Sequence, residues 1–179
     1  MTAAESVDPS RAAWGEPRSK TVHWYAPMIT AAAGRPLPGV DFLRAIKDGT
    51  IAPPPIAALF GLQIREVEVG RVVFECEPDE SAYNPIGVVH GGLVCTLADT
   101  VAGCAVQTTL DAGVAYTSID LNVSYLRPVT KDSGVLRATG RVTKPGRRVA
   151  FSSAEIADQA GKIVATATSS LLVMDPRVA

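Results

Sequence analysis

The longest apolar run in the chain extends from Val88 to Val106, and Asp99 is its only formally charged residue. Placed on a helix over 91–110, the apolar positions cover most of the circumference, which predicts a long helix that is buried nearly all round. Burying a carboxylate without partners costs several kcal/mol or forces it to take up a proton. A sequence that keeps Asp99 in this run therefore uses it or pairs it.

Alternating apolar and polar positions on both sides of this helix predict strands. We expect a hairpin over 62–77 and the clearest strand over 115–126. One face of that strand carries Thr117, Ile119, Leu121, Val123 and Tyr125, and the other carries Ser118, Asp120, Asn122 and Ser124. Three more strands are expected at 135–143, 149–157 and 163–174. A strand pair, one long helix and four hairpin-connected strands predict an α+β fold in which an antiparallel sheet wraps the helix.

The N-terminal segment is different in character. Residues 1 to about 38 are rich in Ala, Pro, Gly and Ser without a sustained period, which is typical of an arm lying over the core. We expect Trp14, Trp24 and Tyr25 to anchor it against its own domain or a partner subunit. A short amphipathic helix near 41–48 precedes Gly49. We assign residues 1–55 to an N-terminal extension and residues 56–175 to the main domain.

Composition narrows the class of protein. A length of 179 residues, of which 47% are hydrophobic, allows one domain with a substantial core. The net charge of −1 gives no electrostatic reason to expect nucleic acid or an anionic membrane as partner. The N-terminus lacks the basic and apolar regions of a secretory signal, so we expect a cytoplasmic protein. The charge of Asp99 and its small polar neighbours argue against a membrane span.

The cysteines and histidines do not form a metal-binding pattern. Cys76, Cys95 and Cys104 are too few and too scattered for a disulfide framework, and we expect them to be reduced packing residues. His23 and His90 are far apart and have no CxxC partners, so we expect no structural zinc.

The start of the predicted helix offers a second chemical element. Gly91 and Gly92 have no side chains where the first unsatisfied helix N–H groups emerge, and the helix dipole favours negative charge there. Backbone donors aimed at a tetrahedral oxyanion are worth roughly 3 to 4 kcal/mol. His90 is placed to cap or brace this turn, and Asn84 to orient a water or a carbonyl. Each of these residues also has a purely structural explanation in a turn or helix cap.

Three motifs together resemble the hotdog-fold acyl-CoA thioesterases. They are Asn84-Pro85-Ile86-Gly87-Val88-Val89-His90-Gly91-Gly92, Leu97-Ala98-Asp99-Thr100, and the stretch from Ser118 to Pro128. The branch most similar is the one typified by phenylacetyl-CoA thioesterase (PaaI-like). The resemblance covers roughly residues 56–174, and the spacing from the His-Gly-Gly motif to the aspartate is specific. It implies a hotdog fold, with each active site across a homodimer interface and with dimers of dimers also found.

The resemblance also implies roles for individual residues. Asp99 would be the general base or the nucleophile, and the Gly91 N–H would polarise the thioester carbonyl. Asn84 would help to hold the attacking water, Ser118 would approach from its strand, and His90 would mainly brace the site. The substrate would be an acyl-CoA, and no separate cofactor is implied because CoA is part of the substrate.

Further contacts with the substrate are expected around these residues. Gly92 and Thr100 flank the site on the helix. Three cations around one turn, Lys144, Arg147 and Arg148, together with Arg127, are candidates for the CoA phosphates, although a solvated hairpin tip is an equal alternative. We also expect Gly91 and Asp99, about 2.5 turns apart, to lie on nearly opposite sides of the helix, which favours a site shared between two chains.

Two other functions are compatible with parts of this pattern. A hydratase of the same fold would need an Asp shortly before Asn84-Pro85 and a His soon after, but Tyr83 and Gly87 occupy the flanking positions. A non-catalytic acyl-CoA-binding or scaffold protein is the alternative class, against which the intact set of Asn84, Gly91 and Asp99 counts. The identity of the acyl group does not follow from the sequence.

Overall fold

The computed structural model describes residues 13–177; the first twelve residues of the expected extension and the last two of the chain lie outside this range. The helices are α1 (Pro27–Gly34), α2 (Gly39–Lys47), α3 (Pro55–Phe60) and α4 (Gly91–Gln107), with short 3-10 turns at Glu80–Ala82 and Lys131–Ser133. The strands are β1 (Gln63–Glu68), β2 (Arg71–Cys76), β3 (Ala115–Tyr125), β4 (Leu136–Lys144), β5 (Val149–Ala157) and β6 (Ile163–Met174).

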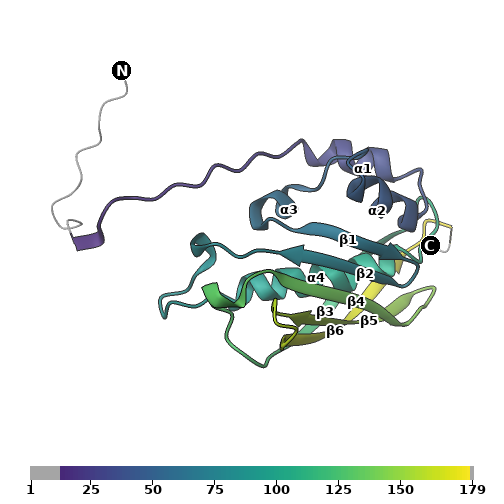
Figure 1. The fold of residues 1–179 in the computed structure, drawn as a ribbon. Helices are drawn as coiled ribbons and strands as arrows, with labels where there is room; N and C mark the ends of the chain where they lie inside the picture. The colour runs from purple at the N-terminus through teal and green to yellow at the C-terminus, as the bar shows by residue number, and fades with distance from the viewer. Residues whose placement is uncertain (1–12, 178–179) are drawn as a thin grey trace, which may run out of the picture.

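The six strands form one antiparallel sheet in the order β1-β2-β4-β5-β6-β3. Figure 1 shows α4 lying against one face of this sheet, with α1, α2 and α3 gathered beyond the β1 edge. The predicted α+β hotdog architecture, a long helix wrapped by an antiparallel sheet, is therefore confirmed. Within the described residues, no helix is long and apolar enough to cross a membrane.

The core lies between α4 and the sheet. Leu97 and Val101 of α4 are fully buried, as are Leu136 of β4 and Ile156 of β5. The helix sits so close to β4 that a Cβ atom on Gly140 would lie 1.9 Å from the carbonyl oxygen of Val101. Only a residue without a side chain fits at this crossing, so Gly140 sets the distance between helix and sheet.

Two expectations for α4 are wrong. The helix ends at Gln107 rather than at residue 110, because the hydroxyls of Thr108 and Thr109 donate to the carbonyls of Ala105 and Val106 and the chain turns away. It is also not buried nearly all round, since Gly92 and Asp99 are exposed in the single chain. The part of the helix surface that carries Gly92 and Asp99 faces outward, whereas Gly103 further along is covered by the Tyr116 ring.

The predicted alternation along β3 is interrupted by a β-bulge. Ser118 pairs with Leu171 and Asp120 with Ser170, so that Ile119 is an extra residue. The bulge is held by β6, where the Ser169 hydroxyl donates to the Asp120 carbonyl at 2.7 Å. An extra residue reverses the alternation. Ser118 therefore faces α4 together with Leu121 and Val123, whereas the sequence pattern had placed it on the opposite face.

The extension has more structure than the sequence pattern indicates. It contains α1, which was not predicted, and α2 lies over the region where a helix near 41–48 was expected. The Gly39 N–H donates to the Leu110 carbonyl, and the Gly113 N–H to the Arg35 carbonyl, both at 2.9 Å. These backbone bonds attach α1 and α2 to the segment that follows α4.

Two ion pairs attach the arm before α1 to the main domain. Trp24 and Tyr25 are largely exposed in the single chain. Arg18 pairs with Glu80, and Lys20 with Asp79 at 2.5 Å. The hydrogen bond from Lys20, supported by Ser81, lowers the pKa of Asp79 to about 2. The arm is therefore attached to the loop that leads toward Asn84.

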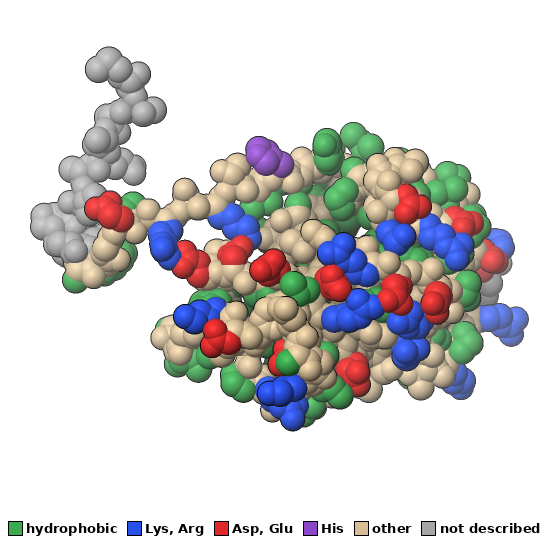
Figure 2. Space-filling view, in the orientation of Figure 1, with side chains coloured by type: hydrophobic (Ala, Val, Ile, Leu, Met, Phe, Trp, Pro, Cys, Tyr) green, Lys and Arg blue, Asp and Glu red, His purple; other side chains and the backbone are tan. Residues whose placement is uncertain are grey.

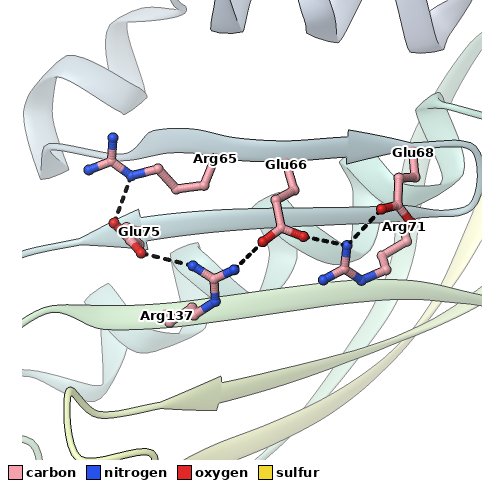
Figure 3. A network of polar contacts seen from close by, with 6 residues as sticks. All are labelled: Arg65, Glu66, Glu68, Arg71, Glu75 and Arg137. Carbon is pink, nitrogen blue, oxygen red and sulfur yellow. Dashed lines mark hydrogen bonds and ion pairs between the residues drawn. The ribbon is translucent and has the colours of Figure 1, made fainter.

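An ionic network covers the outer face of β1, β2 and β4, where cationic and anionic side chains intermingle (Figure 2). Arg65 contacts Glu75 at 2.6 Å, and Arg71 contacts Glu66 at 2.6 Å. Arg137 bridges the two carboxylates, and Figure 3 shows the resulting chain of contacts across three strands. The network contributes alternating charge to the sheet surface near its β1 edge, which disfavours pairing with another strand.

The first prediction concerns the crossing of α4 and β4. We expect Gly140→Ala to destabilise the fold by about 3 kcal/mol, the upper part of the range for overpacking, because the new methyl group meets a backbone carbonyl. Thr139→Val, on the outer face of the same strand, is the control and should change stability by less than about 0.5 kcal/mol. Urea unfolding monitored by circular dichroism measures both variants. Equal stability of Gly140→Ala and wild type would contradict the packing described.

The second prediction concerns pH. Hydrogen bonds from Arg71 and Arg65, respectively, lower the pKa values of Glu66 and Glu75 below 4.5. A carboxylate with a lowered folded-state pKa stabilises the fold above its unfolded pKa, and the contribution is lost as the pH falls through the folded value. We therefore expect the double variant Glu66→Gln, Glu75→Gln to show a shallower fall in Tm between about pH 5 and pH 3.

Differential scanning calorimetry measures this pH dependence. The matched control is Glu77→Gln, an exposed glutamate just after β2. The control should follow the wild-type profile. A double variant whose Tm falls as steeply as that of the wild type would contradict a role for the network in acid stability.

Candidate active site

Asp99 and Ser118 form a hydrogen-bonded pair on the open side of α4. The Ser118 hydroxyl donates to Asp99 Oδ1 at 2.8 Å, and both residues are exposed in the single chain. The β3 bulge makes this contact possible because it turns Ser118 toward the helix. The carboxylate therefore keeps its second oxygen available for a ligand or a water while the first is held in position.

The helix start presents one backbone donor. The imidazole Nδ1 of His90 accepts a hydrogen bond from the Gly92 N–H at 2.8 Å and so caps α4. No described residue accepts a hydrogen bond from the Gly91 N–H. Since the first N–H groups of a helix carry partial positive charge, this donor is suited to an anionic or polarised oxygen. The Gly92 N–H, which sequence reasoning had also placed near the substrate, is already occupied.

Tyr125 is a residue of this site that sequence reasoning did not single out. Its hydroxyl donates to the Gly91 carbonyl at 3.0 Å, and a Cβ atom on Gly91 would lie 3.1 Å from the Tyr125 ring. The ring thus lies directly against the helix start, and a side chain at position 91 would have to displace it slightly. Its signals in the sequence were its place at the end of the clearest strand and within the motif from Ser118 to Pro128.

Asn84 shapes the turn before the helix. Its carboxamide oxygen accepts hydrogen bonds from the N–H groups of Ile86 at 3.1 Å and Val88 at 3.4 Å. Its backbone N–H donates to the Val88 carbonyl at 2.9 Å. The carboxamide nitrogen donates to no described residue. The carboxamide N–H groups of Asn84 are therefore available to donate to a ligand or a water.

The candidate cations fall into two groups. Arg127 lies beside Gly91 and Tyr125 around a hollow of about 280 Å³ at the start of α4. Arg147 lines a different hollow of about 350 Å³ together with Leu110, beyond the other end of the helix, and Lys144 and Arg148 belong to the same turn. Within one chain, the structure does not bring the four cations together.

Thr100 and Cys104 lie on another side of the helix. The Thr100 hydroxyl donates to the Thr96 carbonyl at 2.7 Å, so it is used within α4. Both residues line a cavity toward α2 and α3 rather than the surface beside Ser118. Burial, and secondarily the charge of Asp99, raises the pKa of the Cys104 thiol to about 12, and burial raises that of Cys76 to about 11. Cys76, Cys95 and Cys104 are all free cysteines in the structure.

The relation between Gly91 and Asp99 differs from the expectation. Eight residues at 100° each place them about 80° apart around the helix, so they do not lie on opposite sides. They are instead separated by about 12 Å along the axis, at 1.5 Å per residue. A single thioester carbonyl would have to lie within hydrogen-bonding distance of both groups. The axial separation, not the angle, prevents one helix from supplying both.

The chain matches proteins of known family over this region. The model of the thioesterase superfamily matches residues 86–165, which include the helix start, Asp99 and Ser118. Human acyl-coenzyme A thioesterase 13 is 34% identical over 97 residues, which cover 54% of this chain and 68% of the human protein.

Solved structures show the same fold. A phenylacetic acid degradation-related protein of Ralstonia eutropha JMP134 has a TM-score of 0.67 and 31% identity, over 72% of this chain and 97% of that one. A thioesterase protein of Streptococcus pneumoniae TIGR4, solved with coenzyme A, has a TM-score of 0.58 and 26% identity, over 63% and 85% of the respective chains. The chain belongs to the thioesterase superfamily, as a hotdog thioester hydrolase of the PaaI-like branch.

Proposed function

We propose that this protein hydrolyses acyl-CoA thioesters to free acid and CoA at sites shared between two copies of the chain. The observation that carries the proposal is the Ser118–Asp99 pair, a positioned carboxylate exposed on α4 beside an open sheet edge. The names of the human and pneumococcal relatives, one an acyl-coenzyme A thioesterase and the other solved with coenzyme A, support CoA as the thiol half of the substrate.

The chemistry needs a base or nucleophile and an oxyanion donor. Asp99 either takes a proton from water, which then attacks the carbonyl carbon, or attacks that carbon itself. The carbonyl oxygen gains negative charge and accepts a hydrogen bond from the Gly91 N–H. Collapse of the tetrahedral intermediate breaks the C–S bond and releases CoA as the thiolate. On the second route, water then hydrolyses the resulting anhydride of Asp99.

Two copies supply both groups if their β3 edges pair. The outer edge of β3 is paired with no described strand, and Ile119 is exposed on it. A two-fold axis that pairs two β3 strands antiparallel also makes the two α4 helices antiparallel. If the two-fold axis passes beside Cys95, Gly91 of one copy lies opposite Asp99 of the other along the helix pair. The reason is that each of these residues is four positions away from Cys95. The exposed small residues of α4 leave room for the substrate between the helices.

The same pairing supports a shared role for the cations. Val149 pairs with Leu172, which in turn pairs with Thr117, so the turn over 144–148 lies at the beginning of β3. Arg127 and Gly91 lie at the end of β3. Antiparallel pairing brings these two ends together, one from each copy, where Lys144, Arg147 and Arg148 could join Arg127 in holding the CoA phosphates.

The third prediction tests the role of the carboxylate. We expect Asp99→Asn to lower kcat for a reactive acyl-CoA by at least about 10², the effect of removing a general base, without a change in oligomeric state. Asp132→Asn, an exposed carboxylate in the 3-10 turn before β4, is the control and should retain wild-type activity. Hydrolysis is followed by trapping the released CoA thiol with a chromogenic disulfide. Asp99→Asn with wild-type turnover would exclude the proposed mechanism.

The fourth prediction tests whether the site is shared. Asp99→Asn and Asn84→Ala chains are produced together with different affinity tags, and the doubly tagged dimer is isolated. If Asp99 and the Asn84–Gly91 turn come from different copies, each such dimer has one intact site and should recover about half of wild-type activity. The two parent homodimers are the controls. A mixed dimer no more active than the parents would place each site within a single chain.

A further inference from the structure

An apolar cavity of about 320 Å³ lies between the extension and the main domain. Helix α2 of the extension contributes Leu43 and Ile46, helix α3 contributes Ile56 and Ala57, and the sheet contributes Ile64 and Phe74. Thr100 and Cys104 of α4 complete the lining. The cavity is thus built by elements from both parts of the chain, and all of its lining residues except Thr100 and Cys104 precede the region that matches the thioesterase superfamily.

The cavity lies next to the proposed catalytic carboxylate. Thr100 follows Asp99 directly in α4, and Cys104 lies one turn beyond Thr100 on the same side. The charge of Asp99 also acts on the Cys104 thiol, which it helps to keep protonated. The cavity therefore lies on the side of α4 adjacent to the one that carries Asp99, about 100° around the helix.

The lining favours a neutral, apolar group. The two cations at the cavity, Lys47 and Arg65, are each paired with a carboxylate, Asp48 at 3.5 Å and Glu75 at 2.6 Å. The Thr100 hydroxyl proton is used inside α4. What the cavity offers to a ligand is accordingly mostly apolar surface, from Leu43, Ile46 and Phe74, with the Gln63 amide as a neutral polar group.

We infer that this cavity receives the acyl group of the substrate, so that α2 of the extension and α3, which follows it in the chain, determine acyl specificity. The inference rests on the proposed function and adds the substrate class. A water molecule occupies about 30 Å³ in the liquid, and a methylene group is of similar size, so the cavity holds a chain of roughly eight to ten carbons. The preferred substrate is a medium-chain, uncharged acyl-CoA.

The fifth prediction compares chain-length profiles. We expect kcat/KM of the wild type to rise from acetyl-CoA to a maximum at octanoyl- or decanoyl-CoA and to fall at palmitoyl-CoA. Ala57 is buried in the cavity wall, and Ala57→Leu adds three heavy atoms there. This variant should lower the ratio of octanoyl-CoA to acetyl-CoA activity at least about 10-fold, because a few methylene groups in a filled pocket discriminate by that amount.

A matched pair on α3 controls for stability effects. Ile56 and Leu59 have similar exposure, 43% and 47%, but only Ile56 lines the cavity. Ile56→Ala widens the cavity and should move the optimum to longer chains by about two carbons, at roughly 30 Å³ for each. Leu59→Ala should leave the profile unchanged. Because both positions are partly exposed, these variants test the inference even if Ala57→Leu fails to fold.

A binding measurement separates this inference from the proposed function. Calorimetry on the Asp99→Asn background, with octanoyl-CoA against CoA, should show that the octanoyl group increases affinity at least about 10-fold, and that Ala57→Leu removes this gain. If no acyl-CoA is hydrolysed but the gain is present, the proposed function fails and the cavity assignment stands. If hydrolysis occurs but neither Ala57→Leu nor Ile56→Ala changes the profile, the cavity assignment is overturned.

Discussion

The close seating of α4 against its neighbours is the constraint on which the rest of the structure depends. At each principal crossing a glycine removes the side chain that would hold the elements apart. Gly140 meets Val101 where β4 crosses the helix, Gly103 accommodates the Tyr116 ring from β3, and Gly39 lets α2 rest against Gln107. With the sheet and α2 held this close, the remaining surface of α4 is left open, and Asp99 lies on it.

The sequence predicted the bounds of the helices and strands better than it predicted which of their residues are exposed. The bounds of β5 and β6 are those expected from alternation alone, because each pairs on both sides through most of its length. The sheet face predicted for Ser118 was wrong because of the bulge at Ile119. This bulge depends on the register between β3 and β6, and alternation along a single strand carries no information about that register. The burial of α4 was overestimated because hydrophobicity does not show whether an apolar side contacts its own chain or another.

The candidate site was likewise predicted only in part. The pairing of Asp99 with a residue of the 118–128 motif agrees with the resemblance, since spacing within a helix and a strand fixes such contacts once the sheet forms. The separation of Arg127 from the turn over 144–148 was not foreseen, because strand connectivity alone does not show at which end of a helix a hairpin tip lies. Helix α1 was also missed, since its alanines carry little periodic signal in a segment rich in proline and glycine.

The two edges of the sheet have different consequences for assembly. The β1 edge is packed against α2 and flanked by the network of Glu66, Arg71 and Arg137, whereas the β3 edge is paired with no described strand. A sheet with only one free edge can pair with one further sheet and no more. Pairing through β3, as proposed, would stop at two copies, and the sheet would thereby be protected from the open-ended, fibre-like stacking that two free edges would permit.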